Sequence, residues 1–199
     1  MSNIELLSPF VLVAYTMWST PGPNNMMLVY SGANFGFRKT LPHLLGIIFG
    51  TCLLNGVAVL GLKPLIDAYP QLMLVLKITG SLWLVMIGWK MANASNTQAD
   101  RAASKPMRFM SAAMFQFANP KAITATLALV SLILVALESN ADLLWMIIVI
   151  IPPLSFISII PWLLAGQAIR RFLSTDLRWK LFTRGTGTLT ASCALFLWI

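Results

Sequence analysis

Two short runs rich in proline and asparagine interrupt otherwise apolar stretches of the chain. They occupy residues 21–25 (PGPNN) and 119–121 (NPK). A proline inside a helix removes a backbone donor, destabilises the helix by roughly 3 kcal/mol and frees a carbonyl that hydrocarbon cannot solvate. Irregular backbone at membrane depth persists where protein or a water-lined cavity satisfies its polar groups. The two runs therefore predict a polar site inside a membrane and a pathway for a polar solute.

The residue types in these runs favour a solute that carries a carboxylate. Asn24 and Asn25 are favoured helix N-caps, so the half-helix from Met26 onward would aim its positive dipole end at the first break. Proline is tolerated at a first helical position, and the lysine adds a full positive charge. Two helix N-termini and one lysine form a seat for an anion. The predicted substrate-binding residues are Pro21, Gly22, Pro23, Asn24, Asn25, Asn119, Pro120 and Lys121.

A simpler interpretation of each run is a mere kink whose asparagine satisfies a freed carbonyl. Two breaks with polar companions, together with an intramembrane lysine, favour function over that interpretation. Every Asp and Glu lies at the end of an apolar stretch or in a turn, so proton coupling would use a lysine, a histidine, a carboxylate at a span end or the solute itself.

Further polar residues inside the apolar stretches are candidates for coupling or pore lining: Lys77, His43 and Asn55. Lys77 lies close enough to a span end to snorkel to the surface. His43 could relay protons, although an interfacial histidine is usually only solvated. Asn55 and Gln116 are better explained by interhelical hydrogen bonds. Cys52 and Cys193 lack metal-ligand spacing, and neither a metal nor another cofactor is expected.

The elements that position these residues are six apolar stretches, each near the roughly 20 residues that cross a bilayer. They cover residues 4–31, 41–62, 70–92, 109–136, 143–168 and 180–198. The chain has 199 residues, 58% hydrophobic and 10% charged, whereas soluble domains carry about 25% charged residues. The sequence therefore predicts an all-α integral membrane protein with broken first and fourth helices. Prolines 152, 153 and 161 should kink or divide the fifth stretch.

The basic residues set the expected orientation. Of the 14 Lys and Arg residues, those in the first, third and fifth turns predominate, and the positive-inside rule places these turns in the cytoplasm. Both termini then face outward. The net charge of +8 is dispersed over these turns rather than gathered in one patch, so nucleic acid is not an expected partner. Residues 1–5 contain no Lys or Arg, so the first stretch is not expected to be a cleaved signal peptide.

A polar linker at residues 93–108 divides the chain into two three-span halves, 1–92 and 109–199. Because three is odd, the halves would lie in the membrane with opposite orientation, and each would begin with a broken span. Inverted repeats with paired broken helices are a recurring transporter architecture. Gly46 and Gly50 form a GxxxG pattern that predicts packing within the bundle and leaves a homodimer face open.

Several runs resemble one protein family. Residues 20–25 (TPGPNN), 32–38 (GANFGFR), 42–46 (PHLLG), 80–90 (GSLWLVMIGWK) and 119–121 (NPK) together resemble the LysE/RhtB family of bacterial amino-acid exporters. The resemblance implies a six-span secondary exporter of amino acids or close derivatives in the bacterial inner membrane, driven by the proton motive force. The asparagines after PGP are closer to the branch that exports neutral amino acids, including cysteine and O-acetylserine.

Two functions of other classes compete with export. An intramembrane serine protease would need a nucleophile in a GxSG setting and a membrane-embedded histidine, and Gly80-Ser81 is an incomplete match. The second alternative is a binding or assembly subunit that transports nothing itself. Amino-acid counterflow in proteoliposomes separates both alternatives from an exporter.

Overall fold

The computed structural model describes residues 3–62, 68–94, 105–139, 143–195 and 198. All regular secondary structure within these residues is helical. The helices in chain order are α1 (Asn3–Ser19), α2 (Pro23–Phe35), α3 (Phe37–Val57), the π-helical turn η1 (Ala58–Leu62), α5 (Pro70–Ala92), α7 (Phe109–Ala118), α8 (Pro120–Ser139), α9 (Leu143–Ile169), the 3-10 turn η2 (Arg170–Phe172) and α10 (Asp176–Ser192).

Both predicted interruptions are present. The first expected span is divided into α1 and α2 at residues 20–22, and the fourth into α7 and α8 at Asn119. By length and hydropathy, two helices of the described chain could each cross a membrane alone, Phe37–Leu60 and Leu143–Phe172. The halves of the broken spans are shorter, so each broken span would need both halves to cross.

The later helices differ from the expected bounds or divisions in two places. Of the two outcomes expected for its three prolines, a kink or a division, helix α9 shows no division, and it runs from Leu143 to Ile169. Helix α10 begins at Asp176 and ends at Ser192, whereas the sequence predicted a span over residues 180–198. Most of the predicted linker, residues 95–104, lies outside the described residues.

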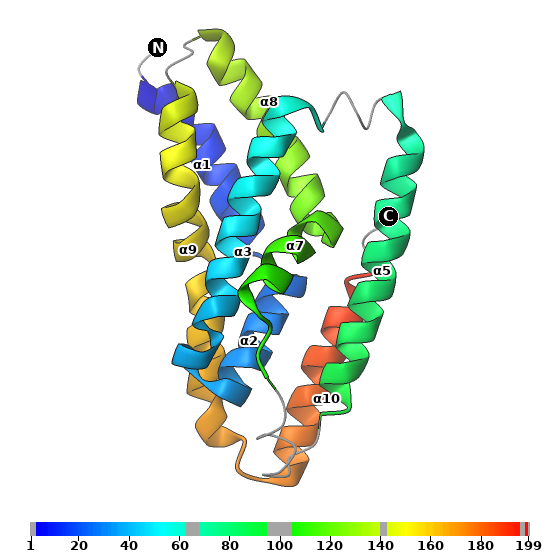
Figure 1. Ribbon diagram of the computed structural model, residues 1–199. Coiled ribbons are helices and arrows are strands. Elements are labelled where there is room, and N and C mark those ends of the chain that lie inside the picture. Colours follow the sequence, from blue (N-terminus) through cyan, green and yellow to red (C-terminus); the bar gives the residue numbers. More distant parts are fainter. Residues whose placement is uncertain (1–2, 63–67, 95–104, 140–142, 196–197, 199) are drawn as a thin grey trace.

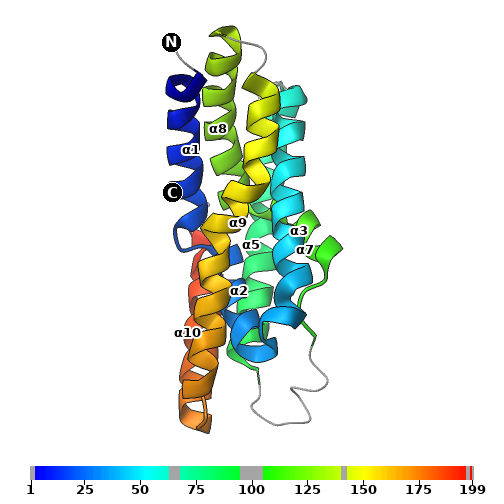
Figure 2. The same ribbon diagram turned by 90° about the vertical axis from the view of Figure 1, so that its left-hand side faces the viewer.

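The helices form an elongated bundle (Figures 1 and 2). The junction of α2 with α3, the last turn of α5 and the start of α10 lie at one end, and the N-terminus lies at the other (Figure 1). We call the former the basic end because it carries Arg38, Lys39, Lys90, Arg170 and Arg171. The predicted grouping of basic turns therefore matches the arrangement in space.

Small residues bring the helices into close contact. A Cβ atom at Gly46 or Gly50 would collide with backbone atoms of α7, and one at Gly166 would collide with Val29 of α2. The GxxxG pattern of α3 thus packs within the bundle, as predicted. Gly36 joins α2 to α3 with a φ of 77°, a conformation that favours glycine.

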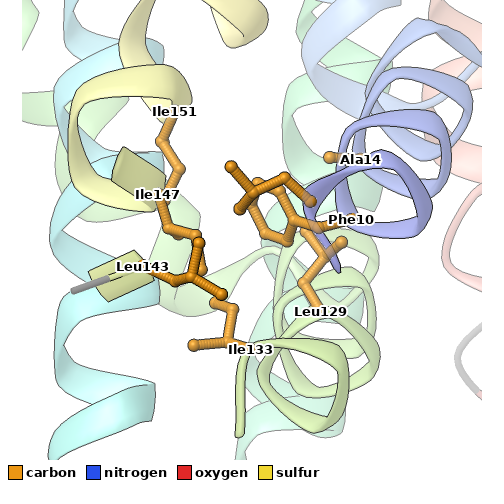
Figure 3. Close-up of a cluster of buried hydrophobic side chains, with 8 residues drawn as sticks. Phe10, Ala14, Leu129, Ile133, Leu143, Ile147 and Ile151 are labelled. Carbon is orange, nitrogen blue, oxygen red and sulfur yellow. The ribbon is translucent and has the colours of Figure 1, made fainter. Parts of the chain in front are cut away.

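Two clusters of buried apolar side chains join helices of the bundle. The Phe10 cluster joins α1, α8 and α9 (Figure 3), and it consists of Leu7, Phe10, Ala14, Leu129, Ile133, Leu143, Ile147 and Ile151. The Met27 cluster joins α2, α5, α7 and the end of α10, and it consists of Met27, Leu84, Met91, Phe115 and Ala194.

Candidate functional site

The first break leaves the last carbonyl groups of α1 without partners in their own helix. Donors from other elements satisfy them. Asn25 Nδ2 donates to the carbonyl oxygens of Trp18 (2.9 Å) and Thr20 (2.8 Å). The indole nitrogen of Trp162 in α9 donates to the carbonyl oxygen of Ser19 at 3.1 Å. The unwound backbone therefore persists because protein groups, rather than lipid, surround it.

Lys121 completes this set of donors from the second break. Its Nζ donates to the carbonyl oxygen of Thr20 (2.7 Å), to Thr20 Oγ1 (2.8 Å) and to the carbonyl oxygen of Pro21 (3.0 Å). An ammonium group has three protons to donate, and these three contacts use all of them. The positive charge thus lies against the negative dipole end of α1, where it is stabilised.

A pair of amide side chains links the two broken spans. Asn24 Nδ2 donates to Gln116 Oε1 at 2.8 Å, and Gln116 Nε2 donates back to Asn24 Oδ1 at 3.3 Å. Gln116 lies in the last turn of α7 and Asn24 in the first turn of α2. The interhelical bond expected for Gln116 is confirmed, and it brings the two breaks to the same depth in the bundle.

A small cavity of about 40 Å³ lies between the breaks. First-turn residues of α2 and α8 line this cavity, and backbone amides in a first helical turn have no acceptor within their own helix. Its lining residues are Met17, Trp18, Gly22, Pro23, Asn24, Asn25, Ile47, Thr51, Gln116, Asn119, Lys121, Ala122, Ala125, Thr126, Ser155 and Ile159. Asn119 Oδ1 is buried without a hydrogen-bond partner, so this cavity contains an unused acceptor.

The Phe10 cluster closes the cavity on the side of the N-terminus. Ala14 precedes Trp18 by one turn in α1, and Ile151 precedes Ser155 by one turn in α9. A water molecule needs about 10–15 Å³ of such volume, so the cavity accommodates about three waters and no amino acid. The cavity is therefore too small for a solute and must expand to accept one.

The structure brings together most of the predicted binding residues. Six of them line the cavity: Gly22, Pro23, Asn24, Asn25, Asn119 and Lys121. Pro21 takes part through its carbonyl oxygen, and Pro120 begins α8 as expected for a first helical position. The prediction that Asn24 and Asn25 cap α2 was wrong, because α2 begins at Pro23 after an extended Gly22 and has no side-chain cap.

The predicted coupling candidates lie elsewhere. The Lys77 ammonium is 5.9 Å from the ring centre of Trp198. Asn55 donates to the carbonyl oxygen of Thr51 in its own helix, so its predicted interhelical bond was wrong. His43 is 1% exposed rather than solvated, and neither ring nitrogen has a hydrogen-bond partner. None of the three lines the central cavity.

Sequence reasoning missed three small polar residues of the cavity wall: Thr51, Thr126 and Ser155. Each is a hydroxyl residue in a strongly apolar stretch. Such residues are common in membrane helices because the hydroxyl can bond to its own backbone. Their type alone therefore did not distinguish them from packing residues.

Comparison with known proteins identifies the family to which this chain belongs. The profile of the family described as LysE type translocator matches residues 15–199. The chain belongs to the LysE family of translocators. Its membership, the apolar helices and the satisfied breaks agree with a multi-pass membrane transport protein.

Relatives of this LysE-family chain include efflux proteins. The chain is 27% identical over 168 residues to the cysteine/O-acetylserine efflux proteins of Escherichia coli strain K12 and Shigella flexneri serotype 5b strain 8401. Each match covers 83% of this chain and 85% of the relative. No solved structure matches the chain significantly.

Proposed function

We propose that this protein exports amino acids or close derivatives from the cytoplasm through the central cavity. The observation that carries the proposal is the meeting of two helix breaks, with a lysine and buried amides, around one small cavity. The family and the named substrates of its relatives support this substrate class. A neutral amino acid fits best, because the described lining contains one cation and no carboxylate.

The substrate carboxylate would bind between the first-turn amides of α2 and α8 and the Lys121 ammonium. Because Lys121 already donates to three oxygens of residues 20 and 21, the carboxylate must replace at least one of them. That exchange weakens the link between the end of α1 and the start of α8. Substrate binding would thereby loosen the contact that keeps these half-helices together.

The substrate ammonium group needs acceptors in the cavity wall. Asn119 Oδ1 is buried there without a partner, and the hydroxyl groups of Thr51, Thr126 and Ser155 lie in the wall. An unsatisfied buried acceptor costs about 1–3 kcal/mol, and binding an ammonium group would remove that cost. The cavity therefore offers complementary groups to both ends of an amino acid.

Transport would proceed by alternating access in a six-span bundle of two inverted three-helix repeats. The Phe10 cluster would open toward the outside and the Met27 cluster toward the cytoplasm. The basic end would face the cytoplasm, because Lys and Arg concentrate there. The proton motive force would drive export, with Lys121, His43 or the substrate carrying the proton, since no described cavity residue is a carboxylate.

Counterflow of O-acetylserine in proteoliposomes tests the function. We expect Lys121→Met to reduce counterflow at least about tenfold, because it removes the only cation of the described cavity lining, a charge-assisted contact of roughly 1.5–3 kcal/mol. Lys77→Met is the matched control, since Lys77 is also intramembrane but contacts Trp198 instead. Wild-type counterflow by a correctly inserted Lys121→Met variant would contradict the proposed site. No counterflow by the wild-type protein would contradict the function.

A further inference from the structure

A second and larger cavity lies at the basic end, with a volume of about 700 Å³. We call it the vestibule. Helices α2 and α5 form most of its wall, α3 contributes His43, and residues 105–107 before α7 close one side. It shares no lining residue with the central cavity. Its volume is sufficient for an amino acid, whereas the central cavity is not.

The polar groups of the vestibule match a zwitterion. Lys90 and Lys105 contribute two positive charges, and no described lining residue is acidic. A concave surface of one sign raises the local concentration of opposite charge. Asn34 and Asn93 supply amide groups whose Nδ2 atoms already donate to backbone carbonyls four residues earlier. Their Oδ1 atoms therefore remain as acceptors for an ammonium group.

His43 adds a buried polar group to this wall. The side chain is 1% exposed, and both ring nitrogens are buried without a hydrogen-bond partner. Unpartnered buried polar groups are rare in native proteins, and a functional role is one of the explanations for such a group. The neighbouring hydroxyls of Ser31 and Thr40 bond to each other at 3.0 Å, so they do not satisfy His43.

The vestibule and the central cavity are separated by the Met27 cluster. Met27 and Met91 belong to this cluster and also line the vestibule. Phe115 of the cluster is followed directly by Gln116, which lines the central cavity. Asn34 follows Asn24 by ten positions in α2, which corresponds to about 15 Å along the helix. A flexible methionine can change rotamer and let a small solute pass.

We propose that the vestibule is a loading site that binds the carboxylate and ammonium groups of the exported amino acid before the Met27 cluster opens. The proposal rests on the proposed function, because it takes the amino acid as the solute. The carboxylate contacts Lys90 and Lys105, and the ammonium group contacts the amide oxygens of Asn34 and Asn93. His43 hydrogen-bonds to the bound amino acid or to water that it carries. The two lysines are solvent-exposed, so affinity is modest, as release toward the next site requires.

Protection of an introduced cysteine tests the loading site directly. Ala94 lines the vestibule without a proposed ligand contact, so Ala94→Cys is placed in a chain with Cys52→Ala and Cys193→Ala. The protein is reconstituted in lipid nanodiscs, where both faces are accessible, and its reaction with uncharged N-ethylmaleimide is timed. We expect O-acetylserine to slow this reaction. The same measurement on Lys39→Cys, an exposed site outside the vestibule, should show no protection.

Variants separate the loading site from the central cavity. In the Ala94→Cys chain, Lys90→Gln with Lys105→Gln should raise the half-protecting concentration about tenfold, as expected for two partly solvated charge contacts. Lys39→Gln, which removes an exposed charge from the same end, should leave it unchanged. His43→Gln should also raise it. Lys121→Met should abolish counterflow yet leave protection intact, because Lys121 does not line the vestibule.

The outcomes distinguish this proposal from the function on which it rests. Counterflow without protection, or protection that Lys121→Met removes, would overturn the loading site and leave the exporter standing. Protection without wild-type counterflow would support the site and contradict export of that amino acid. Loss of both protection and wild-type counterflow would overturn the loading site and the exporter function together. Equal protection by propionate, which lacks an ammonium group, would overturn the assignment of an amino acid.

Discussion

The ammonium group of Lys121 is tolerated at membrane depth because α1 ends beside it. A charged side chain at the bilayer centre is costly unless it is paired. Three oxygens of residues 20 and 21 pair with this one, and the same contact stabilises the carbonyl end of α1. Lys121 therefore has a structural role in the closed state and, in our proposal, a binding role when the substrate replaces those oxygens.

Gly22 leaves room for the Lys121 side chain, so a larger residue at position 22 should displace that side chain. A Cβ atom at residue 22 would lie 2.7 Å from Lys121 Cδ and 2.9 Å from Lys121 Nζ. Because the extended backbone of Gly22 suits any residue, the effect of Gly22→Ala should come from displacement of the ammonium group alone. We expect counterflow to fall at least about tenfold, equivalent to the loss of one charge-assisted hydrogen bond.

The control for this substitution is Gly56→Ala, because a Cβ atom at residue 56 meets nothing within 4 Å. Both variants should be inserted and monodisperse in detergent. If the Gly22→Ala variant transports at the rate of the Gly56→Ala variant, the position of the Lys121 ammonium group does not determine the transport rate.

Residue identity alone predicted the two breaks and six of the sixteen residues that line the cavity. Proline, glycine and asparagine have distinctive backbone chemistry, so residues 21–25 and 119–121 could be identified without coordinates. The partners of Asn25 and Gln116 could not, because α1 carbonyls and a side chain 92 positions away supply them. The same limit applies to His43, whose burial depends on helices distant in sequence.

Among the helices, proline marked the breaks of two expected spans correctly and did not divide α9. Prolines 152, 153 and 161 lie inside one helix, and Pro9 and Pro42 are also helical. The first break differs from these positions in having donors from other elements, Trp162 and Lys121, that satisfy its freed carbonyls. Those donors depend on tertiary structure, so a proline in the sequence marks a site where a helix can break rather than one where it does.

The amide pair of Asn24 and Gln116 should couple helices α2 and α7 energetically. A double-mutant cycle of Asn24→Leu and Gln116→Leu, measured by unfolding in detergent, should give a coupling of about 1 kcal/mol, within the range of interhelical hydrogen bonds in membranes. Each single variant leaves the amide of the other residue without its partner. The loss in free energy of unfolding for each single variant should therefore exceed half of the loss for the double variant. Asn24→Leu with Thr190→Val should be additive, because the partners of Thr190 Oγ1 are the Thr186 carbonyl and Met91 Sδ rather than Asn24 or Gln116. Additivity of the first pair would contradict the coupling.

Across the whole molecule, the central cavity is too small for a solute, and the larger vestibule lies at the basic end. In the alternating-access cycle that we propose, this arrangement would be a state in which neither the Phe10 cluster nor the Met27 cluster has opened. The Phe10 cluster packs three helices, and the Met27 cluster contains two methionines, which adapt more readily than branched side chains. We therefore expect the Met27 cluster to open first.

The orientation of the protein in the membrane can be tested by labelling introduced cysteines. In a chain with Cys52→Ala and Cys193→Ala, Lys39→Cys lies at the basic end and Tyr69→Cys at the start of α5, 59% exposed at the native tyrosine. A membrane-impermeant maleimide should label Tyr69→Cys in intact cells and Lys39→Cys only in inverted vesicles, because basic turns remain in the cytoplasm. The reverse pattern would place the vestibule outside and remove its role in loading.

Coupling of export to the proton gradient can be tested in inverted vesicles, where the direction of transport depends on the orientation of the protein. In inverted vesicles an exporter that exchanges one proton for a neutral amino acid moves one net charge, worth about 2.3 kcal/mol per 100 mV. Accumulation of labelled O-acetylserine should then approach about 50-fold at 100 mV, since 1.4 kcal/mol corresponds to tenfold. A protonophore should abolish this accumulation but spare counterflow, because one-for-one exchange needs no net proton movement. Accumulation that survives the protonophore would contradict proton coupling. Equal loss of counterflow would contradict one-for-one exchange, because a protonophore removes the proton gradient while the buffer still supplies protons to both faces.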